Sequence, residues 1–143
     1  MVIASFSTPV EKDAIPGLLQ TCGITPTAQR VEIAGILLTK RQHLSADQVL
    51  GHLSTSGAAV SKATVYNTLG LFADHGLIRQ VIVDPTKVFY DSNIDAHHHF
   101  YNIDDGTLTD IEMAEVPIEQ LPRAPVGTIT EAVDIVIRTR NVD

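Results

Sequence analysis

Three consecutive histidines, His97, His98 and His99, are the residues best suited to chemistry, and they are half of the six histidines in the chain. The pattern that follows through Tyr101 and Ile103 favours a β-strand. Successive side chains on a strand point to opposite faces, so we expect His97 and His99 on one face and His98 on the other. Two imidazoles at i and i+2 can chelate one ion if other segments supply further ligands. The cluster alone is compatible with a metal ion, with haem, or with a solvated polar strand.

The elements around this cluster predict a small sheet. Asp104-Asp105-Gly106 is a hairpin signal between expected strands at 97–103 and 107–111. Three prolines in residues 114–127 argue against a long helix there. Alternating apolar residues predict a further strand within 129–140. We therefore expect a C-terminal antiparallel β-sheet.

Such a sheet is too small to be stable alone. We expect it to pair with a second copy of the chain, and Val133, Ile135 and Ile137 to be buried across a homodimer.

The first part of the chain predicts helices followed by a hairpin. We expect helices at 13–22, from Thr25-Pro26 to about Leu38, from a capping box at Ser45 and Gln48 onward, and at 62–74, with Gly76 as the C-cap of the last. Short strands at 79–83 and 87–90 then flank Asp84-Pro85-Thr86. This order is typical of a winged helix-turn-helix, in which the last helix enters the major groove of DNA.

The fold class that we predict is α+β: a winged helix-turn-helix DNA-binding domain at residues 1–92 and a dimerisation and sensing domain at 93–143. Charge follows the same division. Residues 1–93 hold seven basic and seven acidic side chains, whereas residues 94–143 hold three basic and ten acidic ones, which accounts for the net charge of −7. An acidic chain is a poor non-specific binder of nucleic acid, but a neutral N-terminal domain is compatible with specific binding.

Cysteine content and hydropathy bear on location. Cys22 is the only cysteine, so no disulfide forms within one chain, and no run of apolar residues is long enough to span a membrane. The first ten residues lack the basic start of a secretory signal. We expect a cytoplasmic protein with no membrane partner.

The helix at 62–74 carries side chains that suit DNA recognition. Val65, Leu69 and Phe72 form its predicted inward stripe. The candidate DNA-binding residues on its other face and on the following hairpin are Lys62, Thr64, Tyr66, Asn67 and Lys87. Tyr66 and Asn67 can contact base edges and thymine methyl groups, and Lys62 and Thr64 can reach phosphates. An ordinary surface helix is the alternative.

Several of these segments carry a resemblance to a known family. Ala63-Thr64-Val65-Tyr66-Asn67-Thr68-Leu69, Thr25-Pro26-Thr27-Ala28-Gln29-Arg30 and His43-Leu44-Ser45-Ala46 resemble, in order and spacing, the DNA-binding domain of the ferric uptake regulator (Fur) family. Within that family the triple histidine and the tail interrupted by prolines look most like the iron response regulators (Irr).

The resemblance implies a regulatory metal site. The matching ligand positions are His43, Asp91, His97, His99 and Asp110. This set of three imidazoles and two carboxylates suits a divalent ion such as Fe²⁺, Mn²⁺ or Zn²⁺. Haem, if bound, would take His97, His98 and His99. An ion held by both parts of the chain would pin one against the other and so switch DNA binding.

Two departures from the family matter. Asn102 and Asp105 stand where the family has its first Cys-x-x-Cys pair, so we expect no four-cysteine structural zinc. Cys22 is followed by Gly23 rather than proline, so the Cys-Pro haem motif of some iron response regulators is missing.

Three functions remain open on the sequence. The first is a dimeric repressor of iron and haem homeostasis genes that responds to a metal ion or haem at promoter DNA. The second is a peroxide-sensing repressor that depends on iron or manganese, since Asp110 in place of glutamate resembles the peroxide-sensing members. The third is a His/Asp metalloenzyme, which five ligands disfavour because they leave few open positions.

Overall fold

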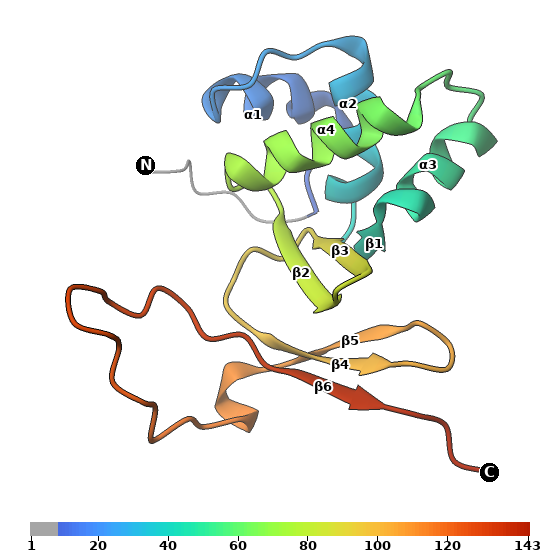
Figure 1. Cartoon of the computed structure of the whole chain (residues 1–143). Helices are drawn as coiled ribbons and strands as arrows, with labels where there is room; N and C mark the ends of the chain where they lie inside the picture. Colours follow the sequence, from blue (N-terminus) through green and yellow to red (C-terminus); the bar gives the residue numbers. More distant parts are fainter. Residues whose placement is uncertain (1–8) are drawn as a thin grey trace. The chain divides into compact units, whose positions relative to one another are not determined.

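The computed structural model describes residues 9–143, which form two compact units: unit 1 ends at Ile94, and unit 2 is Asp95–Asp143 (Figure 1). The expectation about a secretory signal falls mostly on residues 1–8, which lie outside the described part. No helix in the described residues is long and apolar enough to cross a membrane.

Unit 1 contains a helical bundle and a three-stranded sheet. Its elements are a short 3-10 helix η1 (Lys12–Ala14), α1 (Ile15–Thr21), α2 (Ala28–Leu38), β1 (His43–Ser45), α3 (Ala46–Thr55), α4 (Lys62–Asp74), β2 (Arg79–Asp84) and β3 (Lys87–Asp91). The order of helices and hairpin is the one that the sequence predicts, and β1 is an addition to it.

Side-chain caps fix where the helices begin. Ser45 accepts a hydrogen bond from the Gln48 N–H while the Gln48 side chain accepts from the Ser45 N–H, which is the predicted capping box of α3. Helix α2 begins later than predicted: Thr27, not Thr25, is its N-cap, because the Thr27 hydroxyl accepts from the Arg30 N–H. Gly76 follows α4 with φ +74°, a left-handed conformation that glycine adopts without strain.

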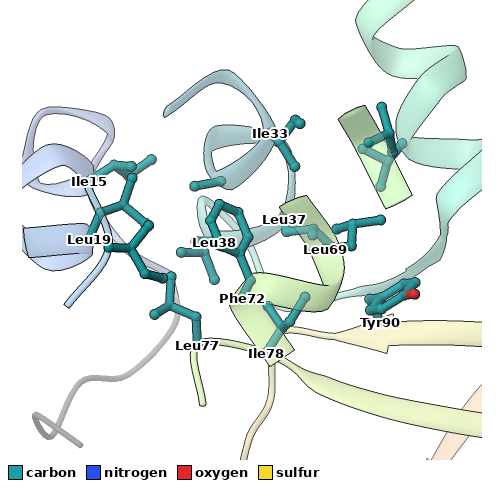
Figure 2. Packing of buried hydrophobic residues seen from close by; sticks show 14 of the residues in the cluster. Ile15, Leu19, Ile33, Leu37, Leu38, Leu69, Phe72, Leu77, Ile78 and Tyr90 are labelled. Atoms are coloured by element: carbon teal, nitrogen blue, oxygen red, sulfur yellow. The ribbon is translucent and has the colours of Figure 1, made fainter. Parts of the chain in front are cut away.

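The core of unit 1 is aliphatic and lies between its helices (Figure 2). Val65, Leu69 and Phe72 are fully buried, so the inward stripe predicted for α4 is confirmed. They pack in one cluster with the buried residues of the first three helices, which include Ile15 and Ile33. This packing fixes the outward face of α4.

The sheet of unit 1 has the strand order β1-β3-β2, and both pairs are antiparallel. The wing hairpin β2–β3 closes through Asp84, whose Oδ1 accepts from the Thr86 N–H at 2.7 Å. Strand β1 places His43 opposite Asp91 and Leu44 opposite Tyr90.

Unit 2 contains a second three-stranded sheet, formed by β4 (His98–Asn102), β5 (Leu108–Ile111) and β6 (Val136–Thr139) in the order β5-β4-β6, with a 3-10 turn η2 (Met113–Glu115). The β4–β5 hairpin is antiparallel, as predicted. Strand β6, however, runs parallel to β4. The sheet is therefore mixed rather than wholly antiparallel, because the long connection after η2 returns the chain to the edge of β4 in the parallel direction.

The last strand is also shorter than predicted. Only residues 136–139 of the expected 129–140 form a strand, and the preceding segment is irregular. Within this chain Ile137 is 38% exposed, whereas Val133 and Ile135 are partly buried. Their burial across a dimer stays a prediction.

The core of unit 1 supports a stability test. Ile33 is fully buried and Ile82, on β2 of the same unit, is 62% exposed. We expect Ile33→Ala to lower the free energy of unfolding by about 2–5 kcal/mol, because it leaves a cavity. The matched variant Ile82→Ala should stay within about 0.5 kcal/mol of the wild type. Urea denaturation followed by circular dichroism measures both, and equal losses would contradict this assignment of the core.

Candidate metal centre

Unit 2 gathers two imidazoles around one carboxylate. The Nε2 atom of His97 lies 3.4 Å from Asp110 Oδ1, and the Nε2 atom of His99 lies 3.5 Å from the same oxygen. Ligand atoms from the three residues lie within 4.8 Å of one another. The two imidazole rings are 4.4 Å apart, centroid to centroid. Three donor atoms that converge in this way can hold one small cation.

The strand geometry explains the convergence. His99 on β4 is directly opposite Asp110 on β5 in the antiparallel register. His97 lies just before β4, two residues from His99, so both side chains fall on the face of Asp110. Both histidines are buried, while the side chain of Asp110 is 45% exposed. The cluster is therefore open to solvent on its carboxylate side.

A backbone contact orients His97 for coordination. Its Nδ1 lies 2.5 Å from the carbonyl oxygen of Asp95. A carbonyl only accepts hydrogen bonds, so Nδ1 carries the proton and the lone pair resides on Nε2, the atom that faces Asp110. Fixing one ring nitrogen in this way is how proteins present the other nitrogen to a metal. Sequence reasoning missed this contact because a main-chain carbonyl leaves no signal in residue type.

His98 has a different environment. Its side chain is fully buried, and its Nδ1 accepts a hydrogen bond of 3.1 Å from the Ile135 N–H. Nε2 of His98 has no hydrogen-bond partner within residues 9–143. His98 thus points away from the His97–His99 pair, as the alternation predicts. The alternative of a solvated polar strand does not hold for His98, because its side chain is fully buried. It ties the segment before β6 to β4.

The remaining predicted ligands belong to unit 1. His43 on β1 is paired directly opposite Asp91 on β3. Asp91 is buried, and its Oδ1 accepts from the Asn93 N–H at 2.8 Å. His43 is partly buried, and its ring lies edge-on to Phe89 at 6.4 Å. One imidazole and one carboxylate are therefore placed side by side at the end of this unit's sheet.

Cys22 lies in the hydrophobic core and is 7% exposed. Burial raises the pKa of its thiol above the usual value. The thiolate is the reactive form, so this residue is a poor redox sensor. The absence of a four-cysteine zinc site stays a prediction from the sequence.

The predicted DNA-binding residues lie on the outward face of α4 and on the wing. Tyr66 and Asn67 are exposed, and the Thr64 hydroxyl, which is partly buried, accepts from Ser61 Oγ at 2.9 Å. Lys62 Nζ lies 3.6 Å from Asp47 and 5.9 Å from the centre of the Tyr66 ring. Lys87, the first residue of β3, lies over the Phe89 ring at 5.5 Å. Lys62, Tyr66 and Asn67 are exposed and Thr64 and Lys87 are partly buried, so this surface can meet another molecule.

Comparisons with known proteins agree on one family. The sequence profile of the ferric uptake regulator family matches residues 21–133. The peroxide-responsive repressor PerR of Staphylococcus aureus is 30% identical over 104 residues, which span 72% of this chain and 70% of that protein. The protein of the same name from Staphylococcus epidermidis is 29% identical over 104 residues, with 72% and 69% of the two chains covered.

Solved structures show the same fold. The ferric uptake regulator of Pseudomonas aeruginosa with manganese superposes with a TM-score of 0.67 at 24% identity, covering 90% of this chain and 98% of that one. The ferric uptake regulator of Vibrio cholerae superposes with a TM-score of 0.70 at 19% identity, covering 88% and 98%. None of these names mentions haem or the iron response regulators. The comparisons therefore support neither haem binding nor membership of the iron response regulator subgroup.

The separate environments of His98 and His99 support a prediction. His99→Ala removes a donor atom from the cluster, and we expect it to weaken Mn²⁺ binding by roughly 100-fold or more. His98→Asn keeps an oxygen that can accept from Ile135, and we expect Mn²⁺ affinity within a few-fold of the wild type. Isothermal titration calorimetry measures both. An equal loss in the two variants would mean that the three histidines act as one site.

Proposed function

Because the chain belongs to the ferric uptake regulator family, whose members are transcription regulators rather than enzymes and bind promoter DNA as dimers, we propose that it is a metal-dependent repressor that senses peroxide. The observation that carries the proposal is the convergence of His97, His99 and Asp110. Two imidazoles and one carboxylate on one face are the donor set of non-haem ferrous sites that keep open positions.

Two findings favour peroxide over haem as the signal. The relatives at about 30% identity are named for their response to peroxide. The acidic member of the cluster is an aspartate, which resembles the peroxide-sensing branch of the family. The weaker candidate is regulation by haem, with the triple histidine as its site. The environment of His98 gives haem binding little support. Its Nδ1 already accepts a hydrogen bond from the Ile135 N–H and its Nε2 is buried, so a bond from His98 to a haem iron would require β4 to open.

We include His43 and Asp91 as further ligands in this proposal. They match the family's ligand positions, and β1 places them directly opposite each other. Only five residues, Ser92–Ala96, separate Asp91 from His97 in the chain. An ion that takes donors from both units would restrict how the two units move. That restriction is the physical basis for coupling metal occupancy to DNA affinity.

The residues of the chain set the conditions for the sensing reaction. Iron bound here would supply one-electron chemistry with peroxide. His97 and His99 would hold the ion through Nε2, so their ring carbons would be close to any peroxide that reacts there. In the net reaction one oxygen atom of peroxide would be retained on an imidazole and the other would leave as water. An oxidised ring would be a poorer ligand, so the ion would be lost and the DNA released.

The choice of ion and carboxylate supports the first functional prediction. Protein loaded with Fe²⁺ should release its operator on exposure to peroxide, while protein loaded with Mn²⁺ should not, because manganese reacts far less readily with peroxide. Asp110→Glu should keep Mn²⁺-dependent DNA binding but lose most of the peroxide response, because the longer side chain can occupy the open position. Fluorescence anisotropy reports DNA binding, and mass spectrometry locates the added oxygen. Retention of DNA by the iron-loaded wild type would refute peroxide sensing.

The outward face of α4 supports a second functional prediction, which concerns DNA binding. We expect Tyr66→Ala and Asn67→Ala each to weaken operator binding by about 1–3 kcal/mol per half-site, since each removes a base-edge or methyl contact. Thermal unfolding should be unchanged, because both side chains are exposed. Gln20→Ala, an exposed position on α1, is the control and should bind like the wild type. Wild-type affinity in both α4 variants would remove this helix from the DNA interface.

A further inference from the structure

A cleft in unit 1 lies beside the face of α4 that we assign to base recognition. Its volume is about 380 Å³. Its lining comes from the first turn of α3, from Tyr66 on α4 and from the wing: Ser45, Ala46, Asp47, Gln48, Tyr66, Thr86, Lys87, Val88 and Tyr90. All of these residues lie within one unit, so the cleft does not depend on how the units are arranged.

Tyr90 is the unusual member of this lining. Its side chain is 95% buried, since only 5% is exposed, and its ring packs on the aliphatic core. Figure 2 shows its oxygen pointing away from that core. This hydroxyl forms no hydrogen bond with another of the residues 9–143. The hydroxyl oxygen itself is open to the cleft rather than buried. It can donate to a ligand that enters the cleft, since the O–H of a largely buried tyrosine usually takes a polar partner.

The first turn of α3 offers more donors at the same place. The capping box uses the N–H groups of Ser45 and Gln48. The first four N–H groups at the start of a helix have no backbone acceptor within it. In α3 the capping box satisfies two of them, which leaves the N–H groups of Ala46 and Asp47. They sit at the positive end of the helix dipole, which favours an anion.

The charges around the cleft also favour an anion. Lys87 on the wing is part of the lining, and its ammonium group lies over the Phe89 ring at 5.5 Å, from which its flexible side chain can turn toward the cleft. Asp47 is the one acidic residue of the lining, but its carboxylate is 72% exposed and lies 3.6 Å from Lys62, which offsets its charge. Tyr66 adds a second phenol at the edge next to α4. The cleft therefore gathers one cation and several neutral donors.

We propose that this cleft binds one phosphodiester group of the DNA backbone, with Tyr90, Lys87 and the free N–H groups of Ala46 and Asp47 as the donors. This inference rests on the proposed DNA-binding function and adds a contact that carries no base sequence. A phosphate held between α3 and the wing fixes the register in which Tyr66 and Asn67 meet the bases.

Tyr90→Phe is the decisive variant, because it removes one oxygen and keeps the ring that packs on the core. We expect it to weaken binding of the full-length, Mn²⁺-loaded protein roughly ten-fold or more, the size of one hydrogen bond to a charged group. The loss should be the same for operator DNA and for a random-sequence duplex at low salt, because phosphate contacts do not read sequence. Unchanged thermal unfolding excludes a folding defect. Affinity within two-fold of the wild type would overturn the proposal.

Two further measurements locate the contact. Replacing single phosphates by methylphosphonate should reveal one linkage in each half-site at which Tyr90→Phe causes no additional loss. The backbone amide signals of Ala46 and Asp47 should shift in nuclear magnetic resonance spectra when the duplex is added. A shift with millimolar inorganic phosphate but none with the duplex would mean that the cleft takes free anions, which overturns the assignment to DNA.

The test of the phosphate contact can fail independently of the test of the proposed function. If Tyr66→Ala and Asn67→Ala lose operator affinity while Tyr90→Phe does not, the repressor function stands and the phosphate contact falls. If the protein binds random duplex through Tyr90 but does not respond to metal or peroxide, the contact stands and the sensing function falls. If it binds no duplex at all, both fall.

Discussion

The register between β4 and β5 is the constraint on which the metal centre depends. It places His99 opposite Asp110, and the two-residue period of the strand then brings His97 to the same side. A slip of one residue would present His98 and Phe100 to the carboxylate instead. The hairpin turn protects against that slip, because Asp105 accepts hydrogen bonds from both the N–H and the hydroxyl of Thr107, and Gly106 takes φ +74°. The convergence of His97, His99 and Asp110 is thus set by the turn that joins β4 to β5.

The sequence predicted what is encoded locally. The capping box at Ser45 and Gln48, the inward stripe of α4 and the hairpin signal at Asp104-Asp105-Gly106 each appear in the structure where they were expected. The start of α2 was wrong by two residues, because Thr25-Pro26 and Thr27 both look like caps and only the hydrogen bond to Arg30 decides between them.

What the sequence could not predict depends on pairing between distant segments. Strand β1 has three residues, and it exists because β3 offers an edge to it. The direction of β6, parallel to β4, is set by where the long connection returns to the sheet. The alternation of apolar and polar residues along β6 predicts a strand but does not predict its direction. The burial of His98 follows from the same return, since Ile135 covers its Nδ1. The orientation of His97 likewise comes from a carbonyl rather than from a side chain.

The charge distribution links the two proposed sites. Unit 1 meets DNA without a net positive charge, and the excess of acidic side chains lies in residues 94–143. Long-range attraction to DNA is therefore weak, and affinity has to come from a few well-placed donors. Neutral donors such as a phenol and helix N–H groups serve this purpose, because they stabilise a phosphate at short range and add no charge that would attract DNA of any sequence. A divalent cation bound at His97, His99 and Asp110 would also lower the negative charge of the acidic part by two. Under the proposed function, metal occupancy would act on DNA affinity in two ways, by restricting the motion of the units and by reducing repulsion, and only the second would be screened by salt.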